Sequence, residues 1–164
     1  IMNYLKNAFF AGLGVTVIIW SFYTVLQQPA PARYQNTNNQ RLTTNSQIRI
    51  GDESIPVEIA DTDAERNLGL SGRAILENGH GLLFIFDTSS KYGFWMKDMR
   101  FPIDIVWIDE NWRIISVTRN VAPETYPKVF EPERAIRYAL ELNAGEAEKF
   151  GIDTGLILSL EGQI

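Results

Sequence analysis

The sequence predicts a mainly β fold: a small antiparallel domain, sandwich-like or barrel-like, with two short helices, preceded by one N-terminal transmembrane helix. Three observations lead to this expectation. About eight short segments alternate apolar and polar residues or are apolar throughout, and turn residues separate them. Two further segments begin with helix-capping residues. One run of 19 uncharged, mostly apolar residues, 8–26, is long enough to cross a bilayer.

Residues 1–26 are predicted to form a membrane anchor or a signal segment. The apolar run exceeds the roughly 7 to 15 residues usual in a signal peptide, which favours retention in the membrane. Lys6 precedes the run and favours a cytoplasmic N-terminus. We therefore expect a single-pass protein of the inner or plasma membrane whose C-terminal domain is extracytoplasmic. Cleavage near Ala32, in the small-residue pattern Ala30-Pro31-Ala32, would instead give a secreted or periplasmic protein.

Residues 27–46 are predicted to form a flexible linker, and residues 47–164 to form the β domain. The linker is rich in Gln, Asn, Thr and Pro, and Tyr34 and Leu42 are its only large apolar side chains. Such a segment buries too little apolar surface to offset the entropy lost on ordering. It would hold the domain close to the membrane.

The first half of the domain is expected to contain a hairpin, a helix and a central strand. Apolar residues alternate with polar ones at 48–50 and 55–59, on either side of the turn 51–54, which indicates two strands. Thr62 and Glu65 have the spacing of a capping box, which predicts a short helix from Asp63 to about Leu70. The segment 82–86 is apolar throughout, as a central strand would be.

The second half is expected to be mostly strands. Alternation or turn residues delimit predicted strands at 92–97, 103–109, 112–121, 134–142 and 155–160. Between them, 121–132 is a Pro-rich irregular loop of the kind that often carries function. Asn143 is placed to cap a second short helix that ends near Phe150.

Composition excludes several classes of function. Three of the 15 basic residues precede Gln47, whereas all 20 acidic residues follow it, so the β domain carries 12 basic against 20 acidic residues. An acidic domain of this kind is not expected to bind nucleic acid. The chain has no cysteine, which excludes disulfides and thiolate chemistry, and its single histidine, His80, cannot form a multi-histidine metal site. No cofactor and no metal are expected.

The segment 92–109 mixes aromatic and charged residues more densely than any other. With its neighbours it resembles domain-of-unknown-function family 192. The motifs that carry the resemblance are Gly81–Phe86, Phe94–Met99, Pro102–Ile105, Ile108-Asp109, Leu140–Gly145 and the earlier segment Arg66–Arg73. The resemblance extends over 47–164 and implies a small, mainly β, sandwich-like or barrel-like domain with no established activity.

Asp104 is the most unusual residue of this segment, because alternation places it on the same strand face as Val106 and Ile108. One interpretation is structural: the carboxylate is buried and held by Lys97, by Arg66 or by backbone N–H groups of the loop 98–101. The other is functional: Asp104 anchors a ligand pocket, where a perturbed environment suits binding or proton transfer.

Three hypotheses about function follow. The first is a membrane-tethered binding module for a small polar ligand or an envelope protein. The second is a carboxylate-dependent hydrolase or lyase in which Asp104 pairs with Asp98, Asp109 or Glu141; the same carboxylates could suit calcium or magnesium. The third is a structural or assembly protein of the cell envelope. No catalytic residue is assigned, and the candidate ligand-binding residues are Trp95, Lys97, Asp98, Asp104, Arg66 and Glu141.

Overall fold

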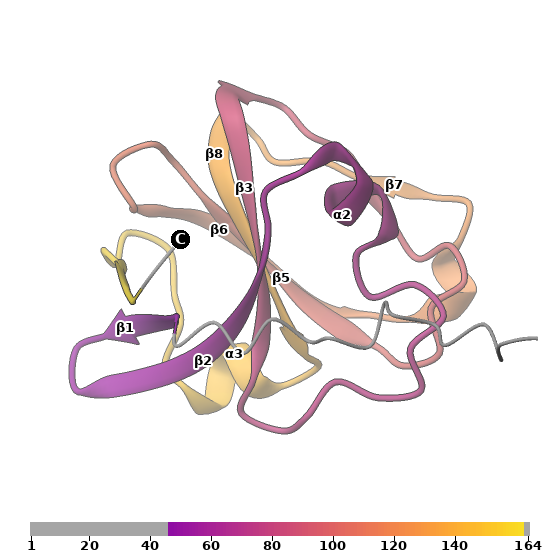
Figure 1. The fold of residues 1–164 in the computed structure, drawn as a ribbon, viewed down its shortest axis with the longest axis horizontal. Coiled ribbons are helices and arrows are strands. Elements are labelled where there is room, and N and C mark those ends of the chain that lie inside the picture. The colour runs from indigo at the N-terminus through magenta and orange to yellow at the C-terminus, as the bar shows by residue number, and fades with distance from the viewer. Residues whose placement is uncertain (1–45, 163–164) are drawn as a thin grey trace, which may run out of the picture. The chain divides into compact units, whose positions relative to one another are not determined.

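The computed structural model describes residues 46–162, which form a curled seven-stranded sheet with two short α-helices (Figure 1). The strand order in the sheet is β6-β5-β8-β3-β2-β1-β9. The strands are β1 (Gln47–Ile50), β2 (Glu53–Ala60), β3 (Gly81–Ser90), β5 (Ile103–Ile108), β6 (Ile114–Val121), β8 (Ile136–Asn143) and β9 (Ser159–Glu161). The helices are α2 (Asp63–Leu68) and α3 (Glu146–Lys149). The prediction of a mainly β domain with two short helices is confirmed.

The sheet is antiparallel except for one strand pair. β2 and β3 run parallel, with Val57 opposite Gly81, whereas the other paired strands of this sheet run antiparallel. The segment between β2 and β3, which contains α2, is long enough to return the chain to the same end of the sheet, and a parallel pair needs such a crossover. The sheet is thus mainly antiparallel, as expected, and the parallel pair of β2 and β3 was not foreseen.

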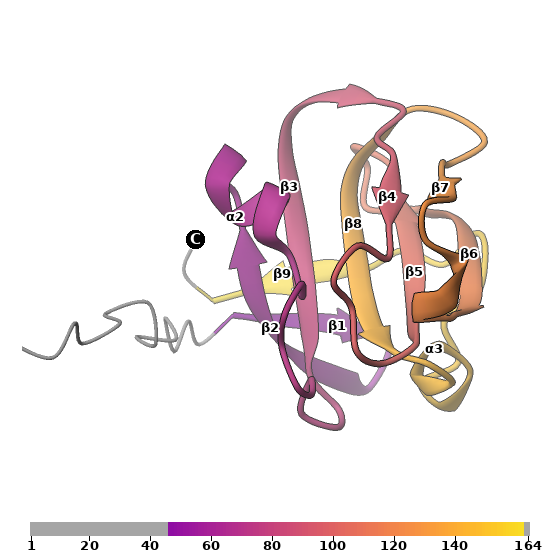
Figure 2. The same cartoon turned by 90° about the vertical axis from the view of Figure 1, so that its right-hand side faces the viewer.

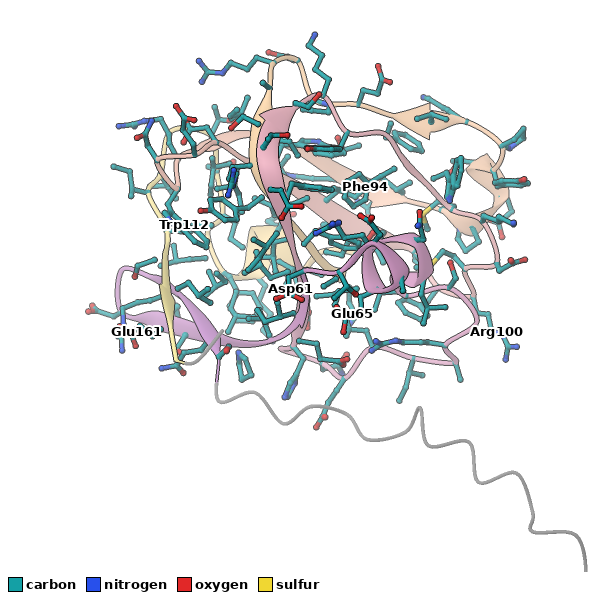
Figure 3. The ribbon with its side chains drawn as sticks, turned by 45° about the horizontal axis from the view of Figure 1, so that its top comes forward. Asp61, Glu65, Phe94, Arg100, Trp112 and Glu161 are labelled. Atoms are coloured by element: carbon teal, nitrogen blue, oxygen red, sulfur yellow. The ribbon has the colours of Figure 1, made fainter. Side chains whose placement is uncertain are left out.

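Two apolar cores lie on opposite faces of the sheet. One contains Ile103, Ile105 and Trp107 of β5, and the other contains Val106 and Ile108 of the same strand. The alternation predicted for this strand is thus confirmed, and all six of its residues are buried. Figure 3 marks Phe94 on the side of the sheet that faces α2, and Trp112 on the other side.

Helix α2 begins as the sequence predicts. The hydroxyl of Thr62 accepts a hydrogen bond from the backbone N–H of Glu65, and the carboxylate of Glu65 accepts one from the backbone N–H of Thr62. The helix ends at Leu68, slightly earlier than expected, because Gly69 follows with a φ of 50° that a helix does not contain. The segment after the helix contacts the turn that follows the aromatic residues 92–95, because the backbone N–H of Gly72 donates to the carbonyl oxygen of Asp98.

A second, two-stranded sheet replaces part of what was predicted as strand and loop (Figure 2). The predicted strand 92–97 is reduced to β4 (Phe94–Trp95), which pairs with β7 (Val129–Phe130). β7 lies inside the segment predicted to be irregular, which also contains the 3-10 helix η2 (Pro123–Thr125). These residues leave the main sheet and cover one of its faces, which sequence alternation alone does not reveal.

The C-terminal part differs from the prediction in two places. Helix α3 is preceded by Gly145 instead of being capped by Asn143, whose side-chain amide donates to the carbonyl oxygen of Leu76. The predicted strand 155–160 is reduced to β9, because the turn before it pairs with the main sheet only through a bridge between Arg113 and Ile157.

The predicted anchor 1–26 and most of the predicted linker lie outside the described residues. Within 46–162, none of the helices has the length and apolar character needed to span a membrane.

Candidate functional site

A pocket of about 420 Å³ is lined by residues of helix α2, of strands β3 and β4 and of the segments beside them, and by Glu141 of β8. Its volume falls within the range of about 300 to 1,000 Å³ typical of small-molecule sites. Its wall is about half apolar and half polar, and it combines aromatic rings with several polar and charged side chains. The aromatic residues of the lining are Phe84, Phe86, Tyr92, Phe94 and Trp95.

The aromatic side chains pack against one another, one pair stacked and the others edge-on. Phe86 and Tyr92 are stacked, with ring planes 8° apart, whereas Phe94 stands at 82° to Phe86 and at 76° to Phe84. The hydroxyl of Tyr92 donates to the carbonyl oxygen of Thr88, which fixes the ring. Such mutual contacts make the wall preorganised, so a ligand would not have to order it on binding. Trp95 is the exception, because 56% of its surface is exposed at the rim.

Glu141 contributes a carboxyl group to this apolar pocket. It lies on central strand β8 between Leu82 of β3 and Ile105 of β5, on the sheet face that carries the aromatic core. The residue is only 6% exposed, and its Oε2 atom has no hydrogen-bond partner among residues 46–162. Buried polar atoms without partners are rare in folded proteins and are informative where they occur.

Burial raises the pKa of Glu141 from 4.5 to about 8, while the positive charge of Arg73 acts in the opposite direction. Arg73 is itself held by two hydrogen bonds to the carboxylate of Glu58, at 2.8 and 2.9 Å. Glu141 is therefore mostly protonated at pH 7. In that form it offers a ligand one O–H donor, and above pH 8 it offers a negative charge.

Arg66 of helix α2 lines the pocket, and its guanidinium is already occupied. It donates to the carbonyl oxygens of Asp61 and Ile85 and, at 2.6 Å, to the carboxylate of Asp63. The carboxylate of Asp87 lies 3.9 Å away. The hydrogen bond to Asp63 and the nearby carboxylates raise the pKa of Arg66. Arg66 therefore ties α2 to the end of β3 and shapes the pocket.

The comparisons with known proteins identify the family. Residues 45–160 match the model of family DUF192, described as "Uncharacterized ACR". The chain belongs to the DUF192 family. No curated protein matches it.

Two crystal structures resemble this DUF192 domain. One is described as "a putative transcription regulator" from Sinorhizobium meliloti 1021; it is 26% identical, with a TM-score of 0.64, over 70% of this chain and 90% of that chain. The other is a protein of unknown function from Novosphingobium aromaticivorans DSM 12444, 25% identical with a TM-score of 0.64, over 70% of this chain and 82% of that chain. The likeness supports the fold and assigns no ligand.

Asp104 of the DUF192 domain lies outside this pocket. It is fully buried, and its carboxylate accepts hydrogen bonds from the backbone N–H groups of Asn120, Gly145 and Ala147, at 2.8, 2.9 and 3.1 Å. These donors come from the end of β6 and the start of α3. They differ from the holders expected from sequence, which were Lys97, Arg66 and the loop 98–101. The arrangement corresponds to the structural interpretation of Asp104, in which the carboxylate fastens two chain segments.

The structure brings three of the six sequence-derived candidates together and separates the others. Arg66, Trp95 and Glu141 line the pocket, whereas Lys97, Asp98 and Asp104 do not. Lys97 and Asp98 are exposed and lie in the turn after β4, where Asp98 has a φ of 56°. Within the described part of the chain, no three acidic or histidine side chains gather closely enough to hold a metal ion.

Sequence reasoning missed the aromatic wall because its members come from two segments. Phe84 and Phe86 belong to a strand that was expected to serve only as core, and Tyr92 was expected within a strand of the same sheet. One signal was available: alternation placed Glu141 on a face of β8 with Ala139, inside a strand flanked by apolar strands. A carboxyl group in such a strand marks Glu141 as unusual, as alternation also marked Asp104, but it does not locate the pocket.

Proposed function

We propose that this DUF192 domain binds a small molecule in the aromatic pocket, with Glu141 as the polar contact. The observation that carries the proposal is the unpartnered carboxyl of Glu141, which is 6% exposed and belongs to the lining of a preformed pocket. Small-molecule sites are concavities that combine apolar side chains with polar groups, often with a perturbed pKa. This pocket combines aromatic rings, polar side chains and the raised pKa of Glu141.

The retention of an unpartnered carboxyl group supports a binding role over a purely structural one. Leaving a buried polar atom without a hydrogen bond costs about 1 to 3 kcal/mol, and an apolar side chain of similar size would avoid that cost. The cost of burying Asp104, by contrast, is offset by three hydrogen bonds within the fold. A ligand that forms a hydrogen bond to Glu141 would offset the free-energy cost of burying its carboxyl group.

We propose also that the binding domain is tethered to the membrane by the apolar run 8–26 and faces the extracytoplasmic side. The support is the sequence pattern described above. Protease accessibility of the domain in intact cells and in inverted vesicles tests this placement: the domain should be cleaved in intact spheroplasts and protected in inverted vesicles.

Thermal unfolding of the full chain in detergent, against a panel of small metabolites, tests the binding proposal. A ligand at about 100 times its dissociation constant stabilises the native state by about 2.7 kcal/mol, which raises the melting temperature by several degrees. The shift should disappear in Trp95→Ala, because Trp95 forms the rim, and in Glu141→Leu, which removes the polar contact while preserving bulk.

Tyr126→Ala is the matched control, because Tyr126 is an exposed aromatic residue that does not line the pocket. It should leave the ligand-induced shift unchanged. A shift that survives both Trp95→Ala and Glu141→Leu would locate binding elsewhere and contradict the proposal. A panel broad in charge and size that produces no shift would favour the structural or assembly role instead.

A further inference from the structure

The charges that line the pocket are unbalanced toward the negative side. Apart from Tyr92, the ionisable side chains of the described lining are Asp63, Arg66, Asp87 and Glu141. Because Glu141 is mostly protonated at pH 7, two carboxylates stand against one guanidinium there, and three above pH 8. The guanidinium is occupied by two carbonyl oxygens and the carboxylate of Asp63. An anionic ligand would therefore be repelled by the carboxylates and would find no free cationic side chain in the described lining. A cationic ligand would be attracted by the negative potential of the same groups.

The aromatic wall favours the same kind of ligand. Aromatic rings carry negative charge on their faces and attract a cation within about 6 Å of the ring centre. Phe86 is already used in this way: it stacks on Tyr92, and the guanidinium carbon of Arg66 lies 5.7 Å from the centre of its ring. Of the aromatic residues of the wall, Trp95 has the largest exposed surface for a further cation, at 56%. Phe86 and Phe94 stand at 82° to each other and form two walls that meet at nearly a right angle. Aromatic cages are the recognition elements of quaternary ammonium ions.

We infer that the ligand of this pocket is an organic cation, an amine or a quaternary ammonium ion, whose charge lies beside the aromatic walls and the carboxyl group of Glu141. The inference rests on the proposed function and specifies its ligand class. A neutral sugar fits the lining less well, because it needs several directed hydrogen bonds. Of the hydroxyl groups in the lining, that of Ser71 already donates to the carbonyl oxygen of Lys97.

The protonation of Glu141 makes binding of a cation depend on pH. A bound cation favours the ionised carboxyl, so binding at pH 7 releases a proton from a group whose pKa is about 8 in the free protein. The charged groups around it are Asp63 and Arg66 from α2, Asp87 from β3, and Arg73 from the segment after α2. If only the ionised form binds, affinity should be about tenfold weaker at pH 7 than at pH 9.

The test compares choline with its neutral isostere 3,3-dimethyl-1-butanol, which has the same shape without the charge. Binding of each to the full chain in dodecyl maltoside is measured by calorimetry at pH 7 and pH 9. A panel of methylammonium, tetramethylammonium and ethanolammonium extends the comparison to other ammonium ions. We expect a cation to bind at least about tenfold more tightly than the isostere at pH 9, with an advantage that shrinks at pH 7.

Two variants distinguish cation binding in the pocket from a nonspecific effect of the net charge of the protein. Glu141→Gln should abolish the advantage of the cation and its pH dependence. Glu146→Gln should retain both, because Glu146 is equally buried, with a 7% exposed fraction and an unpartnered Oε2 within the described residues, but lies outside the pocket. Dihexanoyl phosphatidylcholine, used as a monomer, distinguishes the source: tighter binding than choline indicates a lipid headgroup, and weaker binding indicates a free cation.

The outcomes distinguish this inference from the proposed function. Equal binding of choline and its isostere would overturn the inference and leave a small-molecule pocket. An advantage that persists in Glu141→Gln would also overturn it. Failure of all four ammonium ions to bind overturns the inference, and a neutral or anionic metabolite that binds in their place, with loss in Trp95→Ala, would keep the proposed function.

Discussion

Asp104 and Glu141 are both carboxyl groups on central strands of one sheet, and both are almost completely buried, at 0% and 6% exposure. They differ in what surrounds them. The carboxylate of Asp104 accepts three hydrogen bonds from backbone N–H groups. Glu141 faces an aromatic pocket, and its Oε2 atom has no partner in the described structure. The comparison teaches that burial of an acid does not by itself identify a site, because an acid such as Asp104 can make its hydrogen bonds within the fold and serve only to fasten it.

Glu146 sharpens this distinction. One of its carboxylate oxygens accepts a hydrogen bond from the backbone N–H of Gly79 at 2.7 Å, and the other has no partner among residues 46–162. It does not line the pocket. An unpartnered oxygen on a residue that lines no cavity therefore gives no indication of a ligand. Glu141 differs from Glu146 because it is a residue of the pocket lining, and its Oε2 atom itself has almost no accessible surface.

The largest expected effect concerns the pH dependence of stability. The folded-state pKa of Glu141, about 8, lies above its ordinary value of 4.5, so the folded protein holds a proton that the unfolded chain releases between these values. Stability is therefore complete below about pH 4.5 and falls as pH rises toward 8, by up to about 5 kcal/mol at roughly 1.4 kcal/mol per pKa unit. Glu141→Gln should remove this fall. Urea unfolding of the full chain at pH 5, 7 and 8.5 measures it.

The readout is the difference between wild type and variant, because other groups act with the opposite sign. The hydrogen bond from Thr62 lowers the pKa of Glu65, and the hydrogen bond from Arg49 lowers the pKa of Glu161, so both contribute stability that is lost as the solution becomes acidic. Glu146→Gln is the control and should retain the wild-type slope. An unchanged slope in Glu141→Gln would show that the carboxyl of Glu141 is already ionised in the folded protein.

The second effect concerns Asp104. In Asp104→Asn one carboxylate oxygen becomes an amide NH₂ group, which turns a donor toward a backbone N–H group that needs an acceptor. Leaving one or two buried donors unpaired costs about 2 to 4 kcal/mol, so the free energy of unfolding should fall by that amount. Denaturant unfolding measures the loss. Glu141→Gln, made as a parallel variant near pH 8, should not destabilise the fold; equal losses in the two variants would remove the distinction between the two acids.

Much of the fold follows from local sequence. Alternation in the segment 103–109 predicts which side chains of β5 enter each core, and the spacing of Thr62 and Glu65 predicts the capping box of α2. The oddity of Asp104 was also visible, because it shares a strand face with aliphatic residues. These features depend on residues within a few positions of one another, where periodicity and capping act.

The partners of Asp104 and the pocket could not be predicted in the same way. The backbone donors to Asp104 lie 16, 41 and 43 positions along the chain. The pocket combines α2, β3, β4 and β8, and β4 joins a small sheet with β7 from the segment expected to be irregular. Such assemblies depend on strand order and on one parallel pair, β2 with β3, and periodicity carries no information about either.

The smallest effect concerns the influence of Arg73 on Glu141. Arg73→Met should raise the pKa of Glu141 above its wild-type value, because the positive charge of Arg73 lowers it. The same change breaks the partly exposed ion pair with Glu58 and should cost only about 0.2 to 1 kcal/mol of stability. Arg49→Met is the control, because it removes a similar ion pair, with Glu161, that does not line the pocket. The carboxyl ¹³C shift of Glu141, followed through a pH titration, measures the midpoint. A midpoint that moves equally in both variants would mean that the net charge of the domain sets the pKa of Glu141, and that Arg73 has no specific effect on it.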